Sequence, residues 1–166
     1  MKRLFAITSV MLLSSAMFFV VVCAAADTKP MSGVWSGKVF FFESFEAPLY
    51  IIVNGKGNAT HLGNTDYFAY LVPNTSDKHP DYPLMGGAVD TAASGDALYL
   101  EIYFRDDPSA GTWEQIEEIV GGTGKFAGAS GGTTSRGTYV VDMEPSIQPV
   151  IPSLTWAGTS KGTIEY

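Results

Sequence analysis

Histidine is the side chain that ordinarily changes charge near neutral pH, so His61 and His79 are the first candidates for acid–base or metal chemistry. His61 lies in Ala-Thr-His-Leu-Gly, where it is either a general base or metal ligand, or an imidazole buried against the backbone. We favour the structural interpretation because no second histidine or carboxylate lies at ligand spacing. His79 lies in a proline-rich loop, where we expect it to face solvent. The sequence therefore predicts no metal site and no cofactor.

Carboxylates offer a second route to acid–base chemistry. Glu101, Glu117 and Asp142 fall within predicted strands, and a carboxyl group turned into a protein interior would have a raised pKa. The alternation around Glu101 turns it to solvent, and we expect all three side chains to be solvated. Glu117 nevertheless joins His61 as a candidate catalytic residue. Asp96, in Ser-Gly-Asp, is expected to serve a turn first.

The segment 121–131, Gly-Gly-Thr-Gly-Lys-Phe-Ala-Gly-Ala-Ser-Gly, is the most unusual in the chain. It does not fit a phosphate-binding loop, because Phe126 replaces the magnesium-binding hydroxyl and Ile119 replaces the first glycine. It does not fit a dinucleotide fingerprint either, because the residues that follow cannot propagate a helix. A structural role fits better, with glycines forming a sharp turn and Phe126 closing one end of the core. The motif residues are Gly121, Gly122, Gly124, Phe126, Gly128 and Gly131.

Strands with period-two alternation must position these residues. The alternation is clearest over residues 97–105, and residues 113–120 are expected to form a strand rather than a short helix. Asn54-Gly55 predicts a turn between two strands, and residues 73–83 predict a loop. The other expected strands cover residues 33–42, 48–54, 57–62, 67–72, 138–143, 153–158 and 162–166.

Such a pattern of short strands fits either a sandwich or a closed barrel. The strand at residues 162–166 ends on the last residue, which suggests that it closes against the first strand. The sequence therefore predicts an all-β fold, a single antiparallel, roughly eight-stranded β-barrel.

The first 26 residues have the pattern of an export signal, and residues 27–166 form the predicted barrel domain. Lys2 and Arg3 precede an apolar run, and Ala-Ala-Ala before Asp27 suits signal peptidase. We expect an exported protein, periplasmic or extracellular, with no membrane insertion after cleavage. Two alternatives are a retained membrane anchor and a lipoprotein attached through Cys23, although the bulky residue before that cysteine suits lipidation poorly.

Charge and composition narrow the partners. Removing residues 1–26 leaves 8 basic and 17 acidic side chains, a formal charge of −9, and no cysteine. This balance argues against nucleic acid and anionic membrane surfaces, which require a basic footprint. All 18 glycines lie in the remaining chain, which disfavours a helical bundle.

The glycine-rich segment 121–131 resembles the Gly-Gly-Thr-Gly-(Lys/Arg)-Phe-x-Gly-Ala-(Ser/Thr)-Gly signature of small exported bacterial domains with an allene oxide cyclase-like barrel. Segments 57–63, 91–98 and 162–166 are similar to the same group, in the same order. The resemblance implies a barrel that is filled by side chains or holds one small ligand. The wider superfamily includes plant allene oxide cyclases and dirigent proteins, which steer cyclisation or coupling of apolar small molecules, often as oligomers. Only the glycine–phenylalanine turn aligns with the plant cyclases, so their site residues are not placed on positions here and their activity is not carried over.

Two functions follow as expectations. The first is a binding module that holds a hydrophobic small molecule or serves as an interaction protein, with a homo-oligomer as a possible assembly. The second is an isomerase or cyclase acting on a hydrophobic small molecule in the barrel. A cavity lined by an ionisable residue with a shifted pKa would favour the enzyme, and an entirely apolar interior would count against it.

Overall fold

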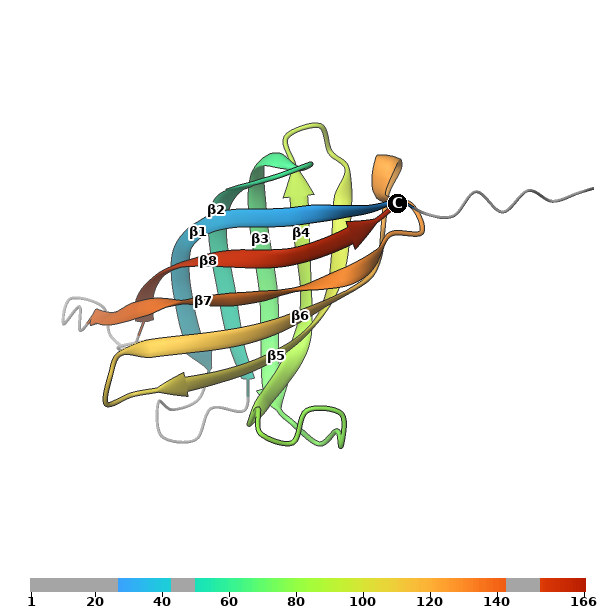
Figure 1. The fold of residues 1–166 in the computed structure, drawn as a ribbon. Coiled ribbons are helices and arrows are strands. Elements are labelled where there is room, and N and C mark those ends of the chain that lie inside the picture. Colours follow the sequence, from blue (N-terminus) through green and yellow to red (C-terminus); the bar gives the residue numbers. More distant parts are fainter. Residues whose placement is uncertain (1–26, 43–49, 143–152) are drawn as a thin grey trace, which may run out of the picture.

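The computed structural model describes residues 27–42, 50–142 and 153–166, which form a closed antiparallel barrel (Figure 1). Eight strands follow one another around it in chain order. The predicted all-β, eight-stranded antiparallel barrel is therefore confirmed. The strands are β1 Thr28–Phe42, β2 Tyr50–Ala59, β3 Gly63–Pro73, β4 Leu84–Ala92, β5 Ala97–Asp107, β6 Thr112–Gly122, β7 Ser130–Asp142 and β8 Ser153–Glu165.

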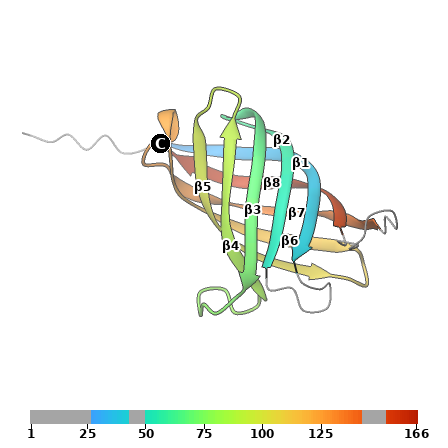
Figure 2. The same ribbon diagram turned by 180° about the vertical axis from the view of Figure 1, so that it is seen from behind.

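The barrel closes where β1 meets β8. The two strands are antiparallel, with Thr28 opposite Glu165 at one end and Phe40 opposite Ser153 at the other. The predicted closure of the last strand against the first is confirmed, although the expected strands at residues 153–158 and 162–166 are parts of one element. Figure 2 shows β2 to β5 completing the far wall of the barrel.

The predicted signal segment, residues 1–26 with Cys23, lies outside the described residues. Of the helical segments within the described ranges, none has the length and apolar character needed to cross a bilayer.

The period-two pattern of β6 decides which side chains enter the barrel. Trp113, Gln115, Glu117 and Ile119 are buried, whereas the residues between them are at least partly exposed. Successive side chains of a strand point to opposite faces of the sheet, so these four face the interior. The strand expected at residues 113–120 is confirmed.

The turn expected at Asn54-Gly55 is wrong, because both residues lie inside β2 and the chain turns at residues 60–62. Gly55 pairs with Gly37 of β1 and with Tyr67 of β3. A Cβ atom at Gly55 would come within 2.7 Å of the Trp156 ring. This glycine is therefore required for close packing inside the barrel rather than for a turn.

One end of the barrel is closed by the short 3₁₀ turn η1 (Gly124–Phe126), which lies beside the C-terminus in Figure 1. Phe126 is fully buried, and its ring meets that of Tyr166 edge-on with 5.3 Å between centroids. Apolar side chains fill this end, among them Met31, Leu62, Ala92, Leu98, Ile119, Phe126, Ala129 and Ile164. The closed end supplies a solid floor for the interior above it.

Candidate ligand-binding cavity

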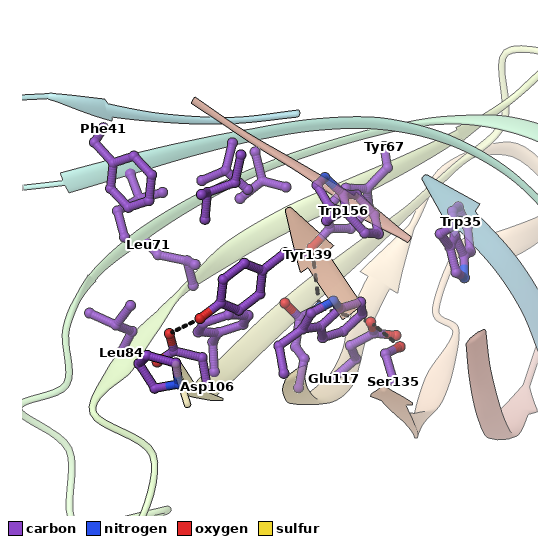
Figure 3. A pocket seen from close by; sticks show the side chains of 18 of the residues that line it. Trp35, Phe41, Tyr67, Leu71, Leu84, Asp106, Glu117, Ser135, Tyr139 and Trp156 are labelled. Atoms are coloured by element: carbon purple, nitrogen blue, oxygen red, sulfur yellow. Dashed lines mark hydrogen bonds between the residues drawn. The ribbon is translucent and has the colours of Figure 1, made fainter. Parts of the chain in front are cut away.

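Above this floor the barrel holds a cavity of about 450 Å³. All eight strands contribute side chains to its wall (Figure 3). Asp106, Pro108 and Val141 line it and are exposed, so the cavity opens at the end opposite η1. Its volume lies in the range of about 300–1,000 Å³ that is typical of small-molecule sites.

Most of the wall is apolar or aromatic. Its apolar and aromatic members are Trp35, Val39, Phe41, Ile51, Val53, Tyr67, Leu71, Leu84, Phe104, Pro108, Trp113, Tyr139, Val141, Leu154 and Trp156. Figure 3 shows Phe41, Leu71 and Leu84 in one part of the wall, and Trp35, Tyr67 and Trp156 in another. Binding of an apolar ligand against such a wall is favourable, because it removes apolar surface of both from water.

Glycines make room for the three tryptophans of the wall. Trp35 lies directly between Gly57 of β2 and Gly158 of β8 in the strand register. A Cβ atom at Gly57 would overlap the Trp35 ring, and one at Gly158 would overlap the Trp113 ring. The Trp35 ring therefore lies over glycine backbone of the adjacent strand β2, and the Trp113 ring over glycine backbone of β8, which holds both rings close to the wall.

The tryptophans and Tyr67 form a connected aromatic group. Trp156 meets Trp113 and Tyr67 edge-on, with 5.7 and 5.9 Å between ring centroids, and Tyr67 lies 6.0 Å from Trp35. Trp35 donates its indole N–H to the Ser160 hydroxyl at 3.0 Å, and Trp113 donates its own to the Thr138 carbonyl at 3.3 Å. The buried Nε1 of Trp156 has no hydrogen-bond partner among the described residues.

The expectation that Glu117 is solvated is wrong, because its side chain is buried at the base of the cavity. Its Oε1 accepts hydrogen bonds from Gln115 Nε2 at 2.8 Å and from the Ser135 hydroxyl at 2.6 Å, and its Oε2 accepts one from the Thr133 hydroxyl. The donors come from β6 and from its neighbour β7. Three donors thus satisfy the carboxylate, which makes its burial tolerable.

Tyr67 extends this network across the cavity. Its hydroxyl oxygen accepts the Gln115 amide at 3.2 Å, which leaves the hydroxyl proton available for donation. Burial, and then the nearby charge of Glu117, raise the pKa of Tyr67 well above its usual value. Tyr67 therefore remains an uncharged phenol.

Asp90 is the second buried carboxyl group of the cavity. Its side chain is 2% exposed, and its Oδ1 has no hydrogen-bond partner among the described residues. Desolvation, and then the charge of Glu117, raise its pKa well above the usual value. Asp90 therefore keeps its proton to a higher pH than an exposed aspartate does. Among the described residues the cavity thus contains one carboxyl group with three donors and a second one with an unpaired oxygen.

Asp106 and Tyr139 lie nearer the open end. The Tyr139 hydroxyl donates a hydrogen bond of 3.2 Å to Asp106 Oδ2, as Figure 3 shows. Partial burial, and then the Asp106 charge, raise the pKa of Tyr139. The entrance is therefore acidic as well.

His61, the other candidate catalytic residue, does not line the cavity. It occupies the turn between β2 and β3 at the closed end, with a positive φ of 71°. Its Nε2 donates to the Pro30 carbonyl at 3.0 Å, and its ring meets that of Tyr166 edge-on. This geometry fits a structural role for a backbone-bonded imidazole, and it separates His61 from Glu117.

The glycine motif forms the turn between β6 and β7. Gly124 has a φ of 57°, and a Cβ atom there would overlap the carboxyl group of Asp96 in the β4–β5 turn. Gly121 and Gly122 end β6, Gly131 lies near the start of β7, and Gly128 lies between them. The motif thus positions Phe126 in the core and contributes no group to the cavity.

His79 is not free in solvent as expected. Its side chain is 26% exposed, its ring centroid lies 4.3 Å from that of Tyr103, and its Nε2 lies 3.1 Å from Glu118. The loop after β3 therefore covers the outer face of β5 and β6 and buries Tyr103 completely. Glu101 does lie on that outer face, half exposed, where it accepts the Tyr103 hydroxyl at 2.7 Å. Asp142 ends β7, and its side chain lies outside the described residues.

Across residues 27–42, 50–142 and 153–166, no three histidine, cysteine, aspartate or glutamate side chains gather as metal ligands. The functional groups that sequence reasoning missed are Tyr67, Asp90, Gln115 and the tryptophans. One signal was present for Asp90, because it alternates with Ala88 and Ala92, but Gly86-Gly87 obscured the strand.

No family model matches the chain, and no curated protein matches its sequence. Among solved structures the chain is similar to the pterocarpan synthase dirigent protein, with 12% sequence identity, over 84% of this chain and 87% of that chain, at a TM-score of 0.49. The resemblance to exported bacterial domains and to allene oxide cyclases stays an expectation.

Proposed function

We propose that the protein binds an apolar or aromatic small molecule inside the barrel. The observation that carries this proposal is the open cavity of about 450 Å³, whose wall is mostly apolar and whose base holds a few polar groups. A ligand gains from the buried apolar surface, and the polar groups orient it. A role as a surface interaction protein would not make use of this cavity.

A screen of the purified protein against hydrophobic compounds tests the proposal. Trp35, Trp113 and Trp156 line the cavity, so binding should change the tryptophan fluorescence. Val53→Phe adds a ring inside the cavity and should block binding. Val140→Phe is the matched control, because Val140 is 66% exposed on the outer face. The proposal would be refuted if a compound still bound to the Val53→Phe variant. It would also be refuted if no compound in a broad screen bound to the wild-type protein.

A second candidate function is an isomerase or cyclase that transfers a proton within the same cavity. Asp90 favours it, because a buried carboxyl group with a raised pKa is able to act as a general acid near neutral pH. The test is to incubate each bound compound with the protein and search for rearranged products. Asp90→Asn should then abolish turnover and leave the binding of uncharged compounds intact. If every compound is recovered unchanged, the enzyme hypothesis is rejected and the binding function stands by itself.

We also propose that the protein is exported, with cleavage before Asp27, on the strength of the pattern in residues 1–26. The intact mass of the mature protein tests this. A mass that begins at a lipidated Cys23 would favour the lipoprotein, and the full-length mass would favour a retained segment. We further propose that the protein forms a homo-oligomer. Light scattering of the same sample measures the oligomeric state.

A further inference from the structure

The charged side chains that line the cavity are all acidic. They are Asp90, Glu117 and Asp106, on β4, β6 and β5, and none of the lining residues in the described part of the chain is lysine, arginine or histidine. An anionic ligand would be desolvated and repelled by these carboxyl groups, and no basic side chain of the lining would compensate by pairing with it. The charge pattern therefore excludes carboxylates and phosphates as preferred ligands.

The aromatic wall presents mainly ring surface, and its unpaired donors in the described part of the chain are Trp156 Nε1 and the Tyr67 hydroxyl. The indole N–H groups of Trp35 and Trp113 are already donated to Ser160 and to the Thr138 carbonyl. These two residues can therefore contact a ligand through the faces of their rings, which carry the negative part of the ring quadrupole. A cation within about 6 Å of such a face is stabilised, most strongly where water is excluded.

Asp90 supplies the second, independent observation. It is a polar side chain buried to 2% exposure, it lines the cavity, and its Oδ1 has no hydrogen-bond partner in the described structure. Buried polar groups are normally paired, since an unpaired one loses its hydration without compensation. The missing partner is therefore a polar group that enters the cavity with a ligand, and the acidic surroundings favour a cationic donor.

We propose that the ligand is an organic ammonium ion with an aromatic or alicyclic body, whose charged nitrogen pairs with Asp90 while the tryptophans surround its body. This inference rests on the proposed binding function and names its ligand class. Glu117 takes part through its charge, because its own oxygens already have three donors. Asp106 at the entrance, and an overall formal charge of −7, favour the approach of cations.

The pairing also predicts a proton balance. In the empty cavity the titratable groups nearest to Asp90 are Tyr67 on β3 and Glu117 on β6, and the raised pKa of Asp90 keeps its proton in place. An ammonium ion stabilises the ionised carboxylate, so binding releases that proton. The affinity for the cation should therefore increase with pH, while the affinity for a neutral ligand should not.

The experiment compares naphthylethylammonium, naphthylethanol and naphthylacetate, which share a ring system and differ in charge. We expect the cation to bind the wild-type protein about tenfold more tightly than the alcohol, with the anion weakest, as measured by calorimetry. Asp90→Asn should remove that preference and leave the affinity for the alcohol nearly unchanged. Asp66→Asn is the control, because it makes the same substitution in an exposed ion pair with Lys56.

Each outcome has a defined meaning. Equal affinities for cation and alcohol, or a preference that survives Asp90→Asn, would overturn the ammonium assignment and leave the binding function intact. Failure of all three compounds to bind would count against the binding function itself. If Asp90→Asn does not fold, calorimetry of the wild-type protein in buffers of different ionisation enthalpy decides, because a cation that binds without releasing a proton refutes the pairing.

Discussion

Replacing Asp90 by asparagine should make the protein more stable, by an amount that depends on pH. Asparagine has nearly the same shape and cannot ionise. In the folded protein the pKa of Asp90 is raised well above its usual value, by desolvation first and then by the charge of Glu117. In the unfolded chain the same carboxyl group loses its proton at about pH 3.9.

The sign and the slope follow from proton linkage. Above about pH 4 the unfolded chain has lost this proton and the folded protein retains it, so the free energy of unfolding of the wild-type protein falls as pH rises. The loss is about 1.4 kcal/mol for each pH unit, until the pKa of the folded state is passed. The variant lacks this loss, so its advantage over wild type should grow with the same slope and then become constant.

Urea unfolding monitored by tryptophan fluorescence at one-unit steps from pH 4 to pH 8 measures the difference. Other titrating groups are present in both proteins and cancel. The Asp66→Asn variant is the control, because Asp66 is 74% exposed. A constant difference between Asp90→Asn and wild type over the whole range would refute the reasoning, since it would mean that Asp90 ionises equally in both states.

Three further predictions concern the barrel itself. Phe126→Ala should lower the free energy of unfolding by about 3 to 5 kcal/mol in urea titrations, because the ring is fully buried at the closed end; a loss below about 1 kcal/mol would contradict its role in the core. Gly158→Ala should cost about 1 to 3 kcal/mol and change the near-ultraviolet circular dichroism of Trp113, whereas Gly87→Ala, which faces the exposed ring of Tyr70, should do neither. Glu114 has a pKa lowered to about 2 by hydrogen bonds from Tyr82 and Arg136, so its contribution is present above about pH 4.5 and is lost as pH falls towards 2. Glu114→Gln should therefore be less stable than wild type at pH 7 by about 1 to 2 kcal/mol and nearly equal to it at pH 2, and unfolding curves with a pH-independent gap would contradict this.

The sequence predicts the strands whose two faces differ strongly in polarity. The strand at residues 97–105 and the closing strand at the C-terminus were of this kind, and both are confirmed within longer elements. Asn54-Gly55 misled the prediction, because Asn-Gly is the pair that two-residue hairpin turns favour. Here the pair lies in β2, where the Trp156 ring leaves no room for a Cβ atom at Gly55; in β4 the Tyr70 carbonyl leaves none at Gly86.

The site was harder to predict than the fold. Along β6 polar residues occupy both faces, so the pattern gave no reason to turn Glu117 inward rather than Glu118. The partners that make its burial tolerable, Thr133 and Ser135, are on β7 and become visible only when the register between the two strands is known. His79 was placed in solvent for a similar reason, since nothing local indicates that its loop packs on Tyr103.

The pairing of β1 with β8 has a consequence for how the protein is made. Thr28 and Glu165 meet although they are 137 residues apart along the chain, and the first strand has one neighbour until the last one is available. During synthesis β1 leaves the ribosome long before β8. Until β8 is available, a sheet formed by the earlier strands has two unpaired edges and an exposed apolar face. Contacts of such long range form slowly, and the exposed edges invite pairing with other chains. We therefore expect pairing between copies to compete with barrel closure until β8 is in place.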